Sequence, residues 1–112
     1  MNADELTIKL KRLLEELKNN RDRAAHQYQA GGRGTVKLLT VAWDAVKDEI
    51  DRLGQDLALT LRFAYGEVWR FNAVVELYPT FEDLLASKAL RITLDRAEKD
   101  LAAYMSDKAS AL

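Results

Sequence analysis

A hydrophobic rhythm with steps of three and four residues runs from Leu39 to Tyr78 without losing phase. This spacing places the apolar side chains on one stripe of a single α-helix. Read as one helix, the stretch would be about 60 Å long at about 1.5 Å per residue. A rod of this length needs neighbouring helices to cover it, so we predict an all-α fold built on one long central helix. The stripe consists of Leu39, Trp43, Val46, Ile50, Leu53, Leu57, Leu61, Ala64, Val68, Phe71, Val75 and Tyr78.

The first helix is predicted to begin near Ala3. Asn2 is a favourable N-cap, and Glu5 lies three residues further on, as in a capping box. The helix should end at the glycine-rich segment 30–34, where glycine can adopt the left-handed C-cap conformation. Because a loop this short keeps two helices side by side, we predict that the first two helices form an antiparallel hairpin.

Pro79 should end the central helix, since the residue before a proline avoids the α region. Thr80 is then a suitable N-cap for a last helix, in which we expect a kink or a short break near residues 87–88. The length of the chain fits one domain, residues 1–112. We therefore predict a bundle of three to four helices.

An α+β fold with a small antiparallel sheet is the alternative. Residues 68–78 and 90–94 alternate between apolar and polar side chains, and residues 35–41 are rich in β-branched ones. We favour the all-α fold, because the helical phase continues unbroken through about forty residues.

Composition excludes several classes of function. The chain has no cysteine and one histidine, which leaves out disulfides, thiolate chemistry and zinc sites built on several imidazoles. Its formal net charge of -1 provides no overall attraction for nucleic acid or anionic lipid. Charged residues such as Arg62 and Glu67 interrupt the most apolar stretch, residues 57–78, so we expect no membrane span. The N-terminus is acidic and has no apolar run, so we expect no secretory signal and a cytoplasmic protein without metal or cofactor.

Paired carboxylates occur at residues 15–16, 48–49 and 82–83. A metal or acid–base site needs carboxylates that converge inside a core. These pairs lie on predicted solvent faces among lysines and arginines, so we interpret them as solvated helix surface.

The single histidine lies in a short polar motif. Arg21 is followed after four residues by His26, and Tyr28 comes two residues later. This motif resembles that of HEPN ribonucleases, small helical bundles that dimerise, in which a histidine follows an arginine after four to six residues. The resemblance implies that His26 would be catalytic in RNA cleavage, that Arg21 would stabilise the phosphate, and that Tyr28 belongs to the same site. An ordinary polar helix end, with Asp22 and His26 as an i,i+4 pair, is the other interpretation.

Basic residues gather in the first helix and the loop after it. Residues 1–37 contain eight Lys or Arg against five acids, whereas residues 38–56 contain two against five. We expect these two segments to pair within the chain. In the alternative interpretation the protein contacts a nucleic-acid backbone within a complex. The candidate contacts are Lys18, Arg21, Arg23, Arg33 and Lys37.

The second half of the predicted central helix carries a second apolar stripe. It is offset by two residues from the first, which on a helix is about 200°, nearly the opposite face. A helix that is apolar on two opposite faces is buried on both, and neither neighbouring helix easily covers the second face. We therefore predict an assembly subunit, not an enzyme, that binds a second copy or a larger helical partner. The predicted interface residues are Leu59, Phe63, Tyr65, Gly66, Trp69, Ala73 and Leu77.

Overall fold

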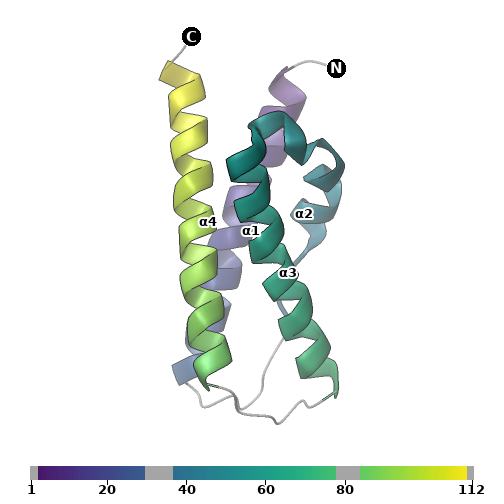
Figure 1. The fold of residues 1–112 in the computed structure, drawn as a ribbon, viewed down its shortest axis with the longest axis vertical. Coiled ribbons are helices and arrows are strands. Elements are labelled where there is room, and N and C mark those ends of the chain that lie inside the picture. The colour runs from purple at the N-terminus through teal and green to yellow at the C-terminus, as the bar shows by residue number, and fades with distance from the viewer. Residues whose placement is uncertain (1–2, 30–36, 78–83, 111–112) are drawn as a thin grey trace.

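The computed structural model describes residues 3–29, 37–77 and 84–110, and every element in these ranges is helical (Figure 1). The all-α prediction is confirmed, because residues 68–77 and 90–94 lie inside helices and residues 37–40 form a linker without strand structure. The helices are α1 (Ala3–Gln29), α2 (Val41–Val46), the 3-10 helix η1 (Lys47–Leu53), α3 (Gln55–Leu77) and α4 (Leu84–Ser110). Only the backbone is described for residues 3–4, 25–29, 74–77, 84–88 and 108–110.

The single helix predicted over residues 39–78 is wrong in its first half. This half is divided into α2 and η1, and Gly54 separates η1 from α3. Gly54 has φ 99° and ψ 154°, a conformation that is accessible almost only to glycine. The hydrophobic spacing gives no sign of this turn, because Ile50 and Leu53 before it and Leu61 after it are buried in the same core.

The helices run alternately down and up the long axis of a molecule that measures 48 × 21 × 20 Å (Figure 1). α4 packs against both α1 and α3, and α2 packs against α1. The break predicted near residues 87–88 is not present, because α4 is continuous from Leu84. The buried core is mostly leucine and alanine: Leu10, Leu13, Leu17, Ala24, Leu38, Val46, Ile50, Leu53, Ala58, Leu61, Ala64, Tyr65, Val68, Leu90, Leu94, Ala97 and Leu101.

Two ion pairs tie η1 to the longer helices. Lys9 of α1 donates to Glu49 at 2.6 Å, and this hydrogen bond holds the pKa of Glu49 below its ordinary value. Arg62 of α3 donates to Asp51 at 2.7 Å and lowers the pKa of that carboxyl in the same way. The Lys9 pair confirms that the basic first helix pairs with the acidic segment after it. The Lys9–Glu49 pair is partly buried and the Arg62–Asp51 pair is exposed. Ion pairs this accessible to solvent contribute little to stability.

Two asparagine side chains hold the linker that leads into α2. The amide of Asn20, on α1, donates to the carbonyl oxygen of Leu39 at 2.8 Å and accepts from its N–H at 2.8 Å. Asn72, on α3, makes the same two bonds to Leu38, at 3.0 Å and 2.7 Å. Each amide therefore bonds both the N–H and the carbonyl oxygen of one linker residue, as a neighbouring β-strand would. The backbone groups of Leu38 and Leu39 thus keep hydrogen-bond partners between two helices.

Replacing Asn20 by alanine should remove both hydrogen bonds to the backbone N–H and carbonyl oxygen of Leu39. We expect the free energy of unfolding to fall by about 1–3 kcal/mol, because backbone groups in the interior lose their hydrogen bonds. Asn19→Ala is the matched control: Asn19 is exposed on the same turn, and its loss should change stability by less than about 0.5 kcal/mol. Urea unfolding followed by circular dichroism measures both variants, and equal effects would contradict the role given to Asn20.

Gly54→Ala and Gly66→Ala form a second matched pair. A Cβ at either position would meet nothing within 4 Å, so only the backbone distinguishes them. Gly54→Ala should destabilise the protein by about 1–3 kcal/mol, because alanine is strained at positive φ. Gly66→Ala lies inside α3 and should raise stability by up to about 1 kcal/mol. Thermal unfolding at low protein concentration tests both, and a shift of the same sign in the two variants would refute this account.

Candidate interaction surface

Four large apolar side chains are exposed on α3 and α4. Leu59, Phe63 and Trp69 on α3 are 56%, 62% and 72% exposed, and Ile92 on α4 is 60% exposed. Isolated apolar residues are common on protein surfaces, whereas apolar residues gathered in one place indicate a binding site. We name the exposed side of α3, together with Ile92, the α3 surface.

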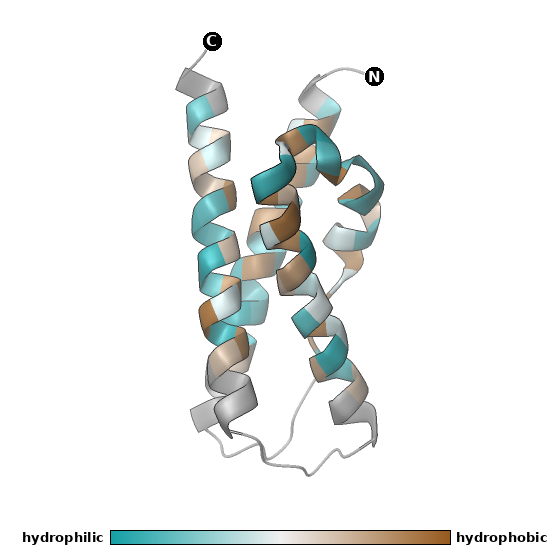
Figure 2. Ribbon diagram, in the orientation of Figure 1, coloured by the Kyte–Doolittle hydropathy of each residue, from teal (hydrophilic) through white to brown (hydrophobic). Residues whose placement is uncertain are grey.

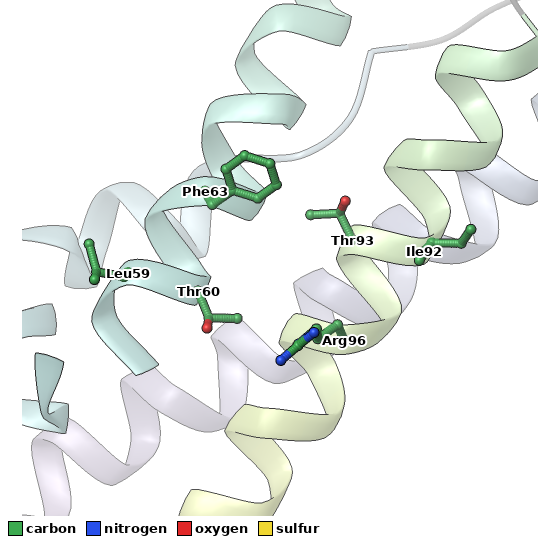
Figure 3. Close-up of a pocket in the computed structure, with 6 residues that line it drawn as sticks. All are labelled: Leu59, Thr60, Phe63, Ile92, Thr93 and Arg96. Carbon is green, nitrogen blue, oxygen red and sulfur yellow. The ribbon is translucent and has the colours of Figure 1, made fainter. Parts of the chain in front are cut away.

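A groove of about 450 Å³ lies between α3 and α4 within this surface (Figure 3). The hydroxyls of Thr60 and Thr93 donate to carbonyl oxygens one turn back in their own helices, at 3.0 Å each. The groove therefore presents mainly carbon to the solvent, with one cationic side chain at its edge. It is lined by Leu59, Thr60, Phe63, Ile92, Thr93 and Arg96.

The helical repeat explains why α3 has apolar residues on both sides. Ala58, Leu61 and Val68 point into the bundle and are buried. Leu59 and Phe63 lie roughly on the other side of the same turns, where no other helix covers them. Hydrophobic residues consequently recur along α3, in contrast to the many hydrophilic positions of α4 (Figure 2).

The structure divides the predicted interface residues. Tyr65 is buried, and its ring stacks on Trp43 with the centroids 4.6 Å apart and 5° between the planes. It therefore belongs to the core and not to the α3 surface. Ala73 is half-buried, and the side chain of Leu77 lies outside the described residues. The exposed members are Leu59, Phe63, Gly66 and Trp69.

Glu16 was predicted to be solvated surface, and this is wrong. The residue is 6% exposed, and its carboxylate accepts from the N–H of Ala42 at 2.8 Å, the N–H of Trp43 at 3.2 Å and the hydroxyl of Tyr65 at 2.7 Å. It thereby caps the first turn of α2, where Thr40 makes no side-chain cap hydrogen bond. Burial, together with the charge of Glu16, raises the pKa of Tyr65, so this phenol remains a hydrogen-bond donor.

Glu16→Gln should lower the free energy of unfolding by about 1.5–3 kcal/mol. The amide that replaces the carboxylate is neutral, and its NH2 group faces donors instead of acceptors. Glu15→Gln is the matched control, because Glu15 is exposed one residue earlier. Chemical unfolding compares the two variants at pH 7. Equal stability of Glu16→Gln and the unmodified protein would refute the capping role.

Carboxylates of α4 hold Arg21, a candidate for both RNA cleavage and nucleic-acid contact. Its guanidinium donates to Asp95 at 3.3 Å and to Glu98, and lies 3.5 Å from Asp22. Burial lowers the pKa of Arg21, but the charges of Glu98 and Asp22 outweigh it and keep that pKa above its ordinary value. The side chain therefore serves as a cross-link between α1 and α4.

The structure describes only some of the other basic and catalytic candidates. Lys18 is exposed on α1, and Arg23 donates to the carbonyl oxygen of Lys37 at 3.4 Å. The side chains of His26, Tyr28 and Arg33 lie outside the described residues.

Two further findings concern residues 3–29, 37–77 and 84–110. Within these ranges, no three His, Cys, Asp or Glu side chains are placed to hold a metal ion. None of the helices described there combines the length and the apolar composition needed to cross a lipid bilayer.

Comparison with protein-family models, curated proteins and solved structures found no match to this chain. The resemblance to HEPN ribonucleases therefore remains limited to the short motif around the histidine. The α3 surface is the feature of the described residues on which a functional argument can be built.

Proposed function

We propose that this protein is a small helical assembly subunit, which binds another helical surface through the α3 surface. One observation carries this function: Leu59, Phe63 and Ile92 surround a single groove while each remains more than half exposed. Fully burying a side chain of this size contributes about 1.5–3 kcal/mol. A partner that covers all three side chains therefore gains the part of this free energy that belongs to their still exposed surface.

The shape of the groove favours a helix as the partner element. Two neighbouring helices with apolar side chains between them accept the apolar side of a third helix, as in other helix-in-groove complexes. Arg96 at the edge is 80% exposed at its side chain, and it pairs with Asp100 at 3.8 Å. Such a residue at the rim can orient a partner without the cost of burying its charge.

Nucleic-acid contact and RNA cleavage remain predictions from the sequence. Among the described residues, Arg21 is held by Asp95 and Glu98, and no contact favours either activity over assembly.

A photo-cross-linking amino acid with a benzophenone group, placed at Phe63 in the cells that make the protein, tests the assembly function. We expect a discrete product of higher mass, because a bound partner would lie within reach of the probe. The same probe at Val41, which is 76% exposed on α2, is the matched control and should give no such product.

A second substitution makes this cross-linking experiment specific for the groove. Ile92→Glu, combined with the probe at position 63, should abolish the product, since it places a charge among the apolar lining residues. Assembly through this surface is refuted if position 63 gives no product, or gives the same products as position 41.

A further inference from the structure

Gly66 has no structural reason within the chain to be glycine. It lies in the middle of α3 with helical geometry, and an added Cβ would meet nothing within 4 Å. A glycine inside a helix costs about 0.5–1 kcal/mol relative to alanine. It is also exposed, one turn from Phe63 on the α3 surface. A missing side chain at such a position suits the close approach of another backbone.

Building on the function proposed above, we propose that the partner is a second copy of this chain. The two α3 helices lie antiparallel about a two-fold axis that passes between Phe63 and Gly66. A two-fold contact joins the same surface patch of both copies, so the patch must be complementary to itself.

The α3 surface fulfils this requirement sterically. In the antiparallel arrangement the Phe63 ring lies opposite the partner's Gly66, and the partner's Phe63 lies opposite Gly66. Phe63 is 62% exposed, and Gly66 offers the open space that a ring requires. The two-fold rotation therefore places the Phe63 ring of each copy over the space beside Gly66 of the other copy.

The side chains on one flank are complementary as well. An antiparallel two-fold arrangement brings the same flank of both helices together. Arg62 and Trp69 are seven residues apart and share one flank, so Arg62, which also donates to Asp51 of its own chain, lies beside the partner's Trp69. The Trp69 ring is 72% exposed and can accept a cation on its face. Arg70 lies on the stripe itself, between Gly66 and Ala73, and pairs with Glu67 of its own chain at 3.2 Å. Asp56, which has the opposite charge, lies within one turn of the partner's Arg70.

The size of this contact indicates a weak dimer. A standard interface takes about 800 Å² from each partner, roughly a tenth of the 7230 Å² that this chain exposes. The stripe from Leu59 to Ala73 is only about 21 Å long at about 1.5 Å per residue. We therefore expect dissociation in the micromolar range, about 10⁻⁶ to 10⁻⁵ M.

Exchanging the ring and the gap between copies tests the arrangement. Phe63→Ala removes the ring, and Gly66→Phe fills the gap with a second one. Each variant alone should dissociate about tenfold or more readily than the unmodified chain. In Phe63→Ala the gap at Gly66 stays unfilled, and in Gly66→Phe the two rings meet each other. An equimolar mixture of the two variants should associate again, since each Phe then lies opposite Ala or Gly.

Sedimentation equilibrium from about 1 µM to about 1 mM, the range that brackets the expected constant, measures these species. The unmodified chain should approach twice 12.7 kDa. Ala45→Phe adds the same bulk at an exposed position of α2 and should leave the dimer unchanged. Circular dichroism verifies that each variant remains helical.

Each outcome supports or overturns the dimer. Recovery of association only in the mixture supports it, whereas a dimer that Gly66→Phe leaves intact, or a mixture that stays monomeric, overturns the geometry. A monomer throughout the concentration range overturns self-association. If the probe at position 63 still gives its specific product in cells, the assembly function survives with a different partner.

Discussion

Where the chain leaves a helix inside this bundle, side chains provide the hydrogen bonds that the backbone has lost. Asn20 and Asn72 pair with the linker from both sides, and Glu16 caps the helix that follows it. These residues come from α1 and α3, so the linker fixes where both helices lie. α4 can then pack against the pair as a regular helix. The polar contacts are few, but the placement of α2 and of the Tyr65–Trp43 stack depends on them.

Hydrophobic periodicity predicts which side chains of a helix face the core and which face outward, and these predictions agree with the structure. The course of α1, the inner side of α3 and the uncovered position of Leu59 and Phe63 all follow from the repeat of about 3.6 residues. The turn at Gly54 does not, because residues on both sides of it enter the same core in the same phase. Only the glycine itself signals that the backbone changes direction.

Contacts between distant segments were beyond the reach of sequence reasoning. Glu16 looks like a surface carboxylate, since its partners lie at residues 42, 43 and 65 and its own helix gives no sign of them. Asn20 sits in a polar stretch and pairs with Leu39 nineteen residues later. Tyr65 is predicted to lie on the interface, but it follows Phe63 by two residues. This is a rotation of about 200° on a helix, so the side chain of Tyr65 faces the core.

At position 66, the stability of the isolated chain and the proposed association favour different residues. A change from glycine to alanine needs one base substitution, and at this position it would make the isolated chain more stable. Selection for stability alone would therefore drive this residue away from glycine. If Gly66 receives another backbone as proposed, the contact would be lost with it. A hydrogen in place of a methyl group thus keeps the chain slightly less stable than its fold permits, which is what the proposed approach of another backbone requires.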